Sequence, residues 1–237
     1  MKVVILAGGA GTRAYPYTEY LPKPMMPVGG KPVLLRVMEL YARQGIKDFV
    51  VSVGYRKEVI IDYFENRTLG WNVEIVDTGA ETDTGGRIYN CRHLLHDTFM
   101  ATYSDGLSDV RLDKLLSFHR SAGVLGTITC VPLRSQYGTV VCEPTGHISE
   151  FKEKPVLAQH WINAGFFVME PGIFNNWRGE NLEREVFPNL LSGRNLAAYH
   201  HHGFFKSMDT YKDQREIEDM FADNVLPWLC PLPQAAA

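Results

Sequence analysis

The chain has 237 residues, of which 45% are hydrophobic and 22% are charged, and its formal net charge is −3. This composition is ordinary for a globular protein built around one large core. The chain lacks the basic excess of nucleic-acid-binding proteins, and no apolar run approaches the roughly 20 residues that cross a bilayer, so we expect neither nucleic acid nor membrane as a partner. The cysteines, at 91, 130, 142 and 230, lack metal-binding spacing and predict reduced thiols in a cytoplasmic protein.

Apolar runs and amphipathic segments alternate through the first half of the chain. Strands are expected over 3–6, 49–53, 73–76, 99–103 and 126–132, and helices over 31–44, 59–64, 84–95 and 111–121. Successive strand–helix units of this spacing predict an α/β fold, with a parallel sheet and helices on both of its faces. In the second half, short strands are expected over 138–142, 148–152 and 166–169, with a helix over 182–191. We expect this half to extend the sheet, or to form a small lobe over the first half.

Glycine is concentrated directly after the first expected strand, at Gly8, Gly9 and Gly11. Residues without a Cβ let the backbone turn tightly and present its N–H groups to a ligand. Arg13 follows the loop, and Lys23 stands further on between two prolines, so both add positive charge suited to phosphate. The spacing matches neither the P-loop nor the dinucleotide-binding pattern. The loop therefore indicates a polyphosphate site of another kind, although glycine turns after strands also occur without a ligand.

Two aspartates are candidate ligands for a hard divalent cation. Asp105 follows the strand expected over 99–103, and ligands of open α/β sheets bind at the carboxyl ends of strands. Mg²⁺ takes one or two carboxylates and completes its shell with phosphate oxygens and water. Asp209 is a candidate second ligand, but Asp209-Thr210 is also typical of a helix start, where the aspartate would only cap the helix.

Three further positions in the second half have polar groups suited to a phosphorylated ligand. Glu153-Lys154 follows an expected strand and adds a third cation, unless it is only a solvated turn. Asn163 carries an amide that can contact hydroxyl groups, and Tyr137-Gly138 allows close approach of the backbone. The three histidines at 200–202 are interpreted as surface residues, because only two of them share a face of a strand.

Together these motifs resemble the sugar-1-phosphate nucleotidylyltransferases, also called nucleotide-sugar pyrophosphorylases. The matching segments run in the family's order along nearly the whole chain: LAGGAGTR (6–13), LPKPMMPVGGKP (21–32), YSDG (103–106), FKEKP (151–155), NAGFFV (163–168) and SMDT (207–210). VDTG (76–79) and TGGR (84–87) make the glucose-1-phosphate cytidylyltransferases the branch that the chain most resembles.

The resemblance implies a Rossmann-like nucleotidyltransferase fold in a single domain, with a mostly parallel, mixed sheet flanked by helices. Residues 1–133 would form the nucleotide-binding half, 134–225 the sugar-binding half, and 226–237 a Pro-rich tail. The implied reaction transfers a nucleotidyl group from CTP to glucose 1-phosphate and releases pyrophosphate. Mg²⁺ is the implied cofactor, and the implied assembly is a homo-oligomer.

The resemblance also assigns residues by position. The nucleotide would contact Leu6, Ala7, Gly8, Gly9, Gly11, Thr12, Thr84, Gly85, Gly86 and Arg87. Catalysis would depend on Arg13 at the triphosphate, Lys23 at the reacting phosphates, and Asp105 and Asp209 on Mg²⁺. The sugar phosphate would contact Tyr137, Gly138, Glu153, Lys154 and Asn163.

Two features keep other substrates open. Only eight residues separate Phe64 from Val73, where the cytidylyltransferase branch has a long insertion, and residues 14–20 are unusually aromatic. The same chemistry with GTP or dTTP, or with another phosphorylated or phosphonate acceptor, is therefore an alternative. A non-catalytic, nucleotide-sugar-binding regulatory subunit is a further alternative, although such a protein would be expected to lose a metal carboxylate or a lysine that this chain retains.

Overall fold

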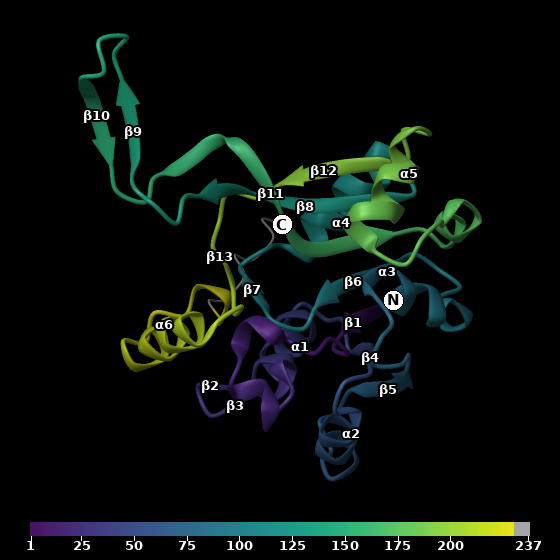
Figure 1. The fold of residues 1–237 in the computed structure, drawn as a ribbon. Helices are drawn as coiled ribbons and strands as arrows, with labels where there is room; N and C mark the ends of the chain where they lie inside the picture. The colour runs from purple at the N-terminus through teal and green to yellow at the C-terminus, as the bar shows by residue number, and fades with distance from the viewer. Residues whose placement is uncertain (230–237) are drawn as a thin grey trace, which may run out of the picture.

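Figure 1 shows the chain as a computed structural model in which residues 1–229 are described. Its centre is a seven-stranded sheet. In the order in which they lie side by side, the strands are β12 (Leu196–His200), β8 (Gly126–Arg134), β11 (Val156–Met169), β6 (Phe99–Tyr103), β1 (Lys2–Leu6), β4 (Asp48–Val53) and β5 (Asn72–Asp77). All neighbouring pairs are parallel except those that β11 makes with β6 and β8. The expected α/β fold with a mostly parallel, mixed sheet is confirmed.

Side chains alternate between the two faces of the sheet and contribute to two hydrophobic cores. In β1, Val3 and Ile5 pack on one face, and Val4 and Leu6 pack on the other. The expected helices on both faces are confirmed. The first core includes residues of α1 (Val33–Arg43), α2 (Lys57–Glu65), α4 (Leu112–Ala122) and α6 (Tyr211–Ala222), and the second includes residues of α3 (Thr84–Asn90) and α5 (Phe187–Leu191).

Two helices are shorter than the sequence predicts. α3 does not fill the expected range of 84–95, because the chain continues as a 3-10 turn over Arg92–Leu94. The helix expected over 182–191 divides into a π-helical turn, Leu182–Val186, and α5, which has Pro188 in its first turn. Proline has no N–H to donate, so it is tolerated at the start of a helical segment and breaks the interior of one.

Strand β11 is longer than the strand expected over 166–169 and already includes Asn163. Its register against β8 shifts twice, and Gly165 has a φ of +76° at the second shift. The side-chain Oδ1 of Asn163 accepts a hydrogen bond from the N–H of Gly165 at 2.8 Å. Asn163 therefore lies in an irregular part of the strand, where the bulge changes the direction of the backbone.

Several short elements complete the described chain, and one pair of them projects from it. The hairpin of β9 (Thr139–Cys142) and β10 (Ile148–Lys152) extends away from the sheet (Figure 1). Its Val141 and Phe151 side chains are more than half exposed. The other short elements are η1 (Thr12–Ala14), η2 (Tyr17–Glu19), η3 (Lys23–Met25), β2 (Pro27–Val28), β3 (Lys31–Pro32), β7 (Gly106–Ser108), η5 (Pro171–Asn176), β13 (Phe205–Ser207) and η7 (Pro227–Leu229).

The start of the expected Pro-rich tail is part of the folded body. Trp228 is buried and its ring packs against Phe204 and Phe221. The rest of the tail, residues 230–237 with Cys230, lies outside the described residues. Among the helices of residues 1–229, none has the length and apolar character needed to cross a membrane.

Replacing Val51 by alanine should lower the free energy of unfolding by roughly 2–3 kcal/mol, because it removes two methyl groups from a fully buried position of β4 and leaves a cavity. Val51 is 0% exposed, whereas Val141 on the hairpin is 53% exposed and provides a matched control. Val141→Ala should change the free energy by less than about 0.5 kcal/mol. Urea denaturation measures both values, and equal losses would contradict the different burial of β4 and the hairpin.

Candidate active site

The candidate site lies where β1 and β6 end. The chain runs from β1 outward to β4 and β5 and then returns, so that β6 lies on the other side of β1. Such a reversal leaves a crevice at the carboxyl ends of the two strands, where ligands of open α/β sheets bind. The glycine loop follows Leu6 of β1, and Asp105 follows β6. The fold therefore brings the loop and this carboxylate to one edge of the sheet.

A short ladder places Asp209 beside Asp105. Strands β7 and β13 pair antiparallel, with Ser207 opposite Gly106. The N–H of Met208 then donates to the carbonyl oxygen of Asp105 at 2.9 Å. Each strand has three residues, so the pattern of the sequence gives little sign of this pairing. The contact that completes the site depends on it.

Asp209 is not the cap of helix α6. The cap is Thr210, whose side chain accepts a hydrogen bond from the N–H of Asp213 at 3.2 Å. In turn, Oδ2 of Asp213 accepts a hydrogen bond from the N–H of Thr210 at 2.8 Å, which completes a capping box. The interpretation of Asp209 as a helix cap is therefore wrong, and its carboxylate is directed to other partners.

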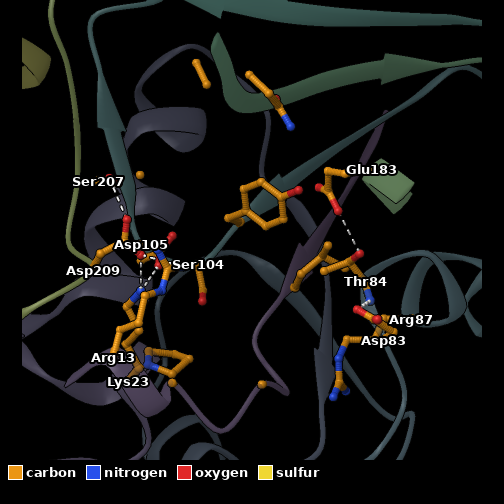
Figure 2. A pocket seen from close by; sticks show the side chains of 18 of the residues that line it. Arg13, Lys23, Asp83, Thr84, Arg87, Ser104, Asp105, Glu183, Ser207 and Asp209 are labelled. Carbon is orange, nitrogen blue, oxygen red and sulfur yellow. Dashed lines mark hydrogen bonds and ion pairs between the residues drawn. The ribbon is translucent and has the colours of Figure 1, made fainter. Parts of the chain in front are cut away.

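Those partners form an ionic cluster with Lys23 at its centre (Figure 2). The Nζ of Lys23 lies 2.5 Å from Oδ2 of Asp105 and 2.9 Å from Oδ1 of Asp209. Arg13 contacts the same Asp209 oxygen through Nη2 at 3.0 Å. The Lys23 side chain is only 10% exposed, whereas Arg13 is 73% exposed. The cluster thus has one enclosed cation and one that reaches solvent.

Burial and charge act on the pKa values of the cluster in opposite directions. Burial raises the pKa of Asp105, and the neighbouring ammonium of Lys23 only partly offsets this effect. Burial also opposes ionisation of Asp209, but Lys23 and Arg13 outweigh it and hold the pKa of Asp209 below its usual range. Burial alone would lower the pKa of Lys23, yet the two carboxylates raise it, so the lysine is held in its charged form.

The loop glycines have different structural reasons. Gly11 has a φ of +63°, and a Cβ there would lie 2.7 Å from the Cβ of Lys23. Gly8 is packed so closely by its neighbours that a Cβ there would collide with the Arg87 side chain and the backbone of Gly54. A Cβ on Gly9 would meet no atom within 4 Å, and Gly9 lines the cavity. Gly8 and Gly11 are therefore required by the fold, whereas Gly9 leaves space for a ligand.

Arg87 stabilises the glycine loop through hydrogen bonds to backbone carbonyl groups. Its side chain is buried, and its guanidinium donates to the carbonyl oxygen of Gly8 at 2.9 Å and to that of Gly79 at 3.0 Å. It also donates to Oγ1 of Thr78 at 2.8 Å. Burial lowers the pKa of Arg87. Although Arg87 reaches the wall of the cavity, its hydrogen bonds fasten the glycine loop to the ends of β4 and β5.

The wall of the cavity that faces the ionic cluster is formed where α3 meets the π-helical turn (Figure 2). Thr84 accepts a hydrogen bond from the N–H of Leu182 at 2.9 Å and donates to Oε2 of Glu183 at 3.2 Å. A Cβ on Gly85 or Gly86 would collide with the segment at Glu180, so these glycines permit close packing of the wall. Burial raises the pKa of Glu183. Glu183 was not among the predicted site residues, because it stands in an expected helical segment without a motif.

The cavity between these walls has a volume of about 560 Å³, which is within the usual range for small-molecule sites. Residues for which no role was predicted also line it, although Tyr103, Ser104 and Ser207 stand in the quoted motifs; the others include Asp83 and Phe205. Five other residues that were expected to contact the nucleotide do not line the cavity but belong to the glycine loop or to the packed start of α3: Ala7, Gly8, Thr12, Gly85 and Gly86. The expected site residues that do line it are Leu6, Gly9, Gly11, Arg13, Lys23, Thr84, Arg87, Asp105, Asn163 and Asp209.

Four expected sugar-phosphate residues lie away from the cavity. Tyr137, Gly138, Glu153 and Lys154 belong to the projecting hairpin and its base, and none of them lines the cavity. Lys154 is paired with Glu153 at 3.8 Å, with both side chains more than half exposed. Their assignment to the sugar phosphate therefore stays a prediction.

The model of the family described as "Nucleotidyl transferase" matches residues 2–206. The chain belongs to this family. A "Probable glucose-1-phosphate cytidylyltransferase" of Bacillus subtilis is 35% identical over 96% of this chain and 99% of its own length. A mannose-1-phosphate guanyltransferase of Schizosaccharomyces pombe is 33% identical over 90% of this chain and 62% of its own length. The protein is a nucleotidyltransferase that acts on sugar 1-phosphates, as the motifs predicted.

Solved structures agree on the fold of this nucleotidyltransferase. HddC from Yersinia pseudotuberculosis, in complex with GMP-PN, superposes with a TM-score of 0.72 over 93% of this chain and 99% of its own, at 23% sequence identity. A UDP-glucose pyrophosphorylase in complex with UDP-glucose has a TM-score of 0.71 over 94% of this chain and 98% of its own, at 19% identity. At these identities the likeness shows a shared fold.

Replacing Gly9 by alanine in the nucleotidyltransferase should raise the KM for the nucleotide at least tenfold, because a methyl group would stand where the ligand approaches the loop. The free energy of unfolding should change by less than about 0.5 kcal/mol, since the space around Gly9 is open. Gly11→Ala is the contrasting variant, and its left-handed backbone should cost about 1–3 kcal/mol. Steady-state kinetics and urea denaturation separate the two effects. A destabilised Gly9→Ala protein with an unchanged KM would contradict the assignment.

Proposed function

We propose that this nucleotidyltransferase uses CTP and Mg²⁺ to convert glucose 1-phosphate into CDP-glucose and pyrophosphate. The observation that carries the proposal is similarity over the full length of both proteins. The Bacillus subtilis relative and a glucose-1-phosphate cytidylyltransferase of Salmonella typhi, 34% identical, match 96% of this chain and at least 98% of their own lengths. The mannose-1-phosphate guanyltransferase extends well beyond the part that matches.

The transfer needs no nucleophile from the protein. An oxygen of the sugar phosphate attacks the α-phosphorus of the nucleotide, and the bond from that phosphorus to pyrophosphate breaks on the opposite side. Both reactants are anions, so the task of the protein is to neutralise charge and to align them. Lys23 lies deep in the cavity and Arg13 lies at its rim, which suits the reacting phosphates and the outer phosphates respectively.

Asp105 and Asp209 have the chemistry to hold Mg²⁺. Their oxygens already bind one cation between them, the ammonium of Lys23, which acts as a stand-in for a metal ion. Among residues 1–229 there is no cluster of three or more His, Cys, Asp or Glu that could hold a metal, but Mg²⁺ needs only one or two carboxylates beside phosphate and water. When bound, Mg²⁺ would neutralise charge on the phosphates.

The remaining assignments follow from the position of each residue around the cavity. Asn163 lines the wall formed by β11 and would contact sugar hydroxyls. The hairpin of β9 and β10, with Lys154 at its base, would bend towards the cavity so that Lys154 reaches the sugar phosphate. The wall at Thr84 and Glu183 lies apart from the ionic cluster and is left for the uncharged base (Figure 2). A homo-oligomer in the cytoplasm stays a prediction.

A guanylyltransferase acting on mannose 1-phosphate is the second candidate. The Schizosaccharomyces pombe relative favours it through 33% identity over 90% of this chain. The alignment with the Bacillus subtilis relative spans 253 positions, more than the 237 residues of this chain, so that relative has positions without a counterpart here. Because these positions have no counterpart in this chain, the preference for the nucleotide base has to be measured directly.

Pyrophosphate release should be fastest with CTP when glucose 1-phosphate and Mg²⁺ are supplied with CTP, UTP, GTP, dTTP or ATP. Asp209→Asn keeps the shape of the side chain and removes its charge, and it should lower turnover by roughly 10²–10³-fold, comparable to the loss of one preorganised electrostatic contact. EDTA should abolish release. Release only with GTP and mannose 1-phosphate would instead support the second candidate.

Asp219→Asn is the matched control for the metal ligand. Asp219 is an exposed residue of α6 outside the cavity, and it undergoes the same change of charge. Its variant should turn over within about twofold of the unmodified protein, as expected for a surface substitution. If Asp209→Asn behaved in the same way as this control, Asp209 would not be a metal ligand.

A further inference from the structure

The ammonium of Lys23 and a bridging metal ion require the same space. Nζ lies 2.5 Å from Oδ2 of Asp105 and 2.9 Å from Oδ1 of Asp209, so it occupies the gap between the two carboxylates. Mg²⁺ binds oxygen at about 2.0–2.1 Å and demands near-ideal octahedral geometry. An ion that bridged these oxygens would be in contact with the ammonium, where like charges repel strongly. Lys23 and the metal therefore cannot occupy this gap together.

The other hydrogen bonds of the carboxylates reinforce this arrangement. Arg13 contacts Oδ1 of Asp209 at 3.0 Å, and the hydroxyl of Ser207 donates to its Oδ2 at 3.1 Å. Two cations therefore balance two carboxylates before any ligand arrives. A metal ion entering alone would have to break contacts of Lys23 without offering its ammonium a new anionic partner, which is costly in a partly buried site.

We infer that Lys23 closes the metal site of the nucleotide-free protein, and that a nucleotide phosphate opens it by taking over the ammonium. This inference rests on the proposed binding of Mg²⁺ by Asp105 and Asp209. The triphosphate supplies the new anionic partner of Lys23, and its departure from the gap leaves two carboxylates for the ion. Metal and nucleotide thus bind cooperatively, and by linkage each raises the affinity for the other by the same factor.

The local structure confines this exchange to the end of the lysine side chain. Lys23 begins the turn η3 and is flanked by Pro22 and Pro24, which restrict its backbone. A Cβ on Gly11 would lie 2.7 Å from Cβ and 3.3 Å from Cδ of Lys23, so the first part of the lysine side chain runs close beside the glycine loop. The exchange would therefore involve the terminal atoms, which would turn from the carboxylates towards the cavity that Gly9, Gly11 and Lys23 itself line.

The test is the affinity for Mn²⁺, which replaces Mg²⁺ on oxygen ligands and is counted by the EPR signal of the free ion. Without nucleotide, Lys23→Met should bind Mn²⁺ about tenfold to a hundredfold more tightly than the unmodified protein, the effect of one or two charge-assisted hydrogen bonds. Lys31→Met is the matched control, because Lys31 is also paired with a carboxylate, that of Glu39, and lies outside the cavity. It should bind Mn²⁺ as the unmodified protein does.

A non-hydrolysable CTP analogue should increase the Mn²⁺ affinity of the unmodified protein more than that of Lys23→Met, after subtraction of Mn²⁺ bound by the analogue alone. Lys23→Gln, which removes the charge and keeps a hydrogen-bond donor, replaces Lys23→Met if the latter does not fold. Equal Mn²⁺ affinities of the unmodified and Lys23 variant proteins without nucleotide would overturn the inference and leave the metal site intact. Absence of Mn²⁺ binding by every variant, even with the analogue, would overturn the proposed metal site together with the inference.

Discussion

The salt bridges of Lys23 to Asp105 and Asp209 are the contact on which the site depends, because they bind together three segments that are distant in the sequence. Lys23, Asp105 and Asp209 are each partly removed from water, and an unpaired charge there would be costly. The turn η3, the end of β6 and the residue before the cap of α6 are therefore held in one arrangement by electrostatics as well as by packing. A divalent metal ion would balance the two carboxylates in place of the cations, and a triphosphate would give Lys23 and Arg13 new anionic partners.

The sheet supplies the frame for this contact. The crossover that places β6 beside β1 brings the glycine loop to the end of β6, and the β7–β13 ladder brings Asp209 to the same point. Arg87 adds rigidity from beneath, since its buried guanidinium donates to several backbone carbonyls of the surrounding loops. Such a frame fixes the backbone positions of Lys23, Asp105 and Asp209 before substrate arrives, which favours electrostatic catalysis.

The parts of the fold that the sequence predicted well are those set by local pattern. Short apolar runs located the first-half strands of the central sheet (β1, β4, β5, β6 and β8), but not the two- and three-residue strands β2, β3 and β7. The loop at Gly9 was recognisable because glycine, which has no Cβ, permits a tight turn and the close approach of a ligand. The local pattern could not show that Asp105 and Asp209 lie side by side, because this depends on two three-residue strands that meet only in the folded chain. The pattern of the sequence likewise could not show that Gly85 and Gly86 face the segment at Glu180, since only the packing of that segment reveals it.

The most direct measurement is a crystal structure with a non-hydrolysable CTP analogue and Mn²⁺, in which anomalous scattering locates the metal. We predict a metal peak between Asp105 and Asp209, with the Nζ of Lys23 moved onto a phosphate oxygen. A structure in which the nucleotide and metal are bound but Lys23 still bridges the two carboxylates would contradict the central role assigned to this contact.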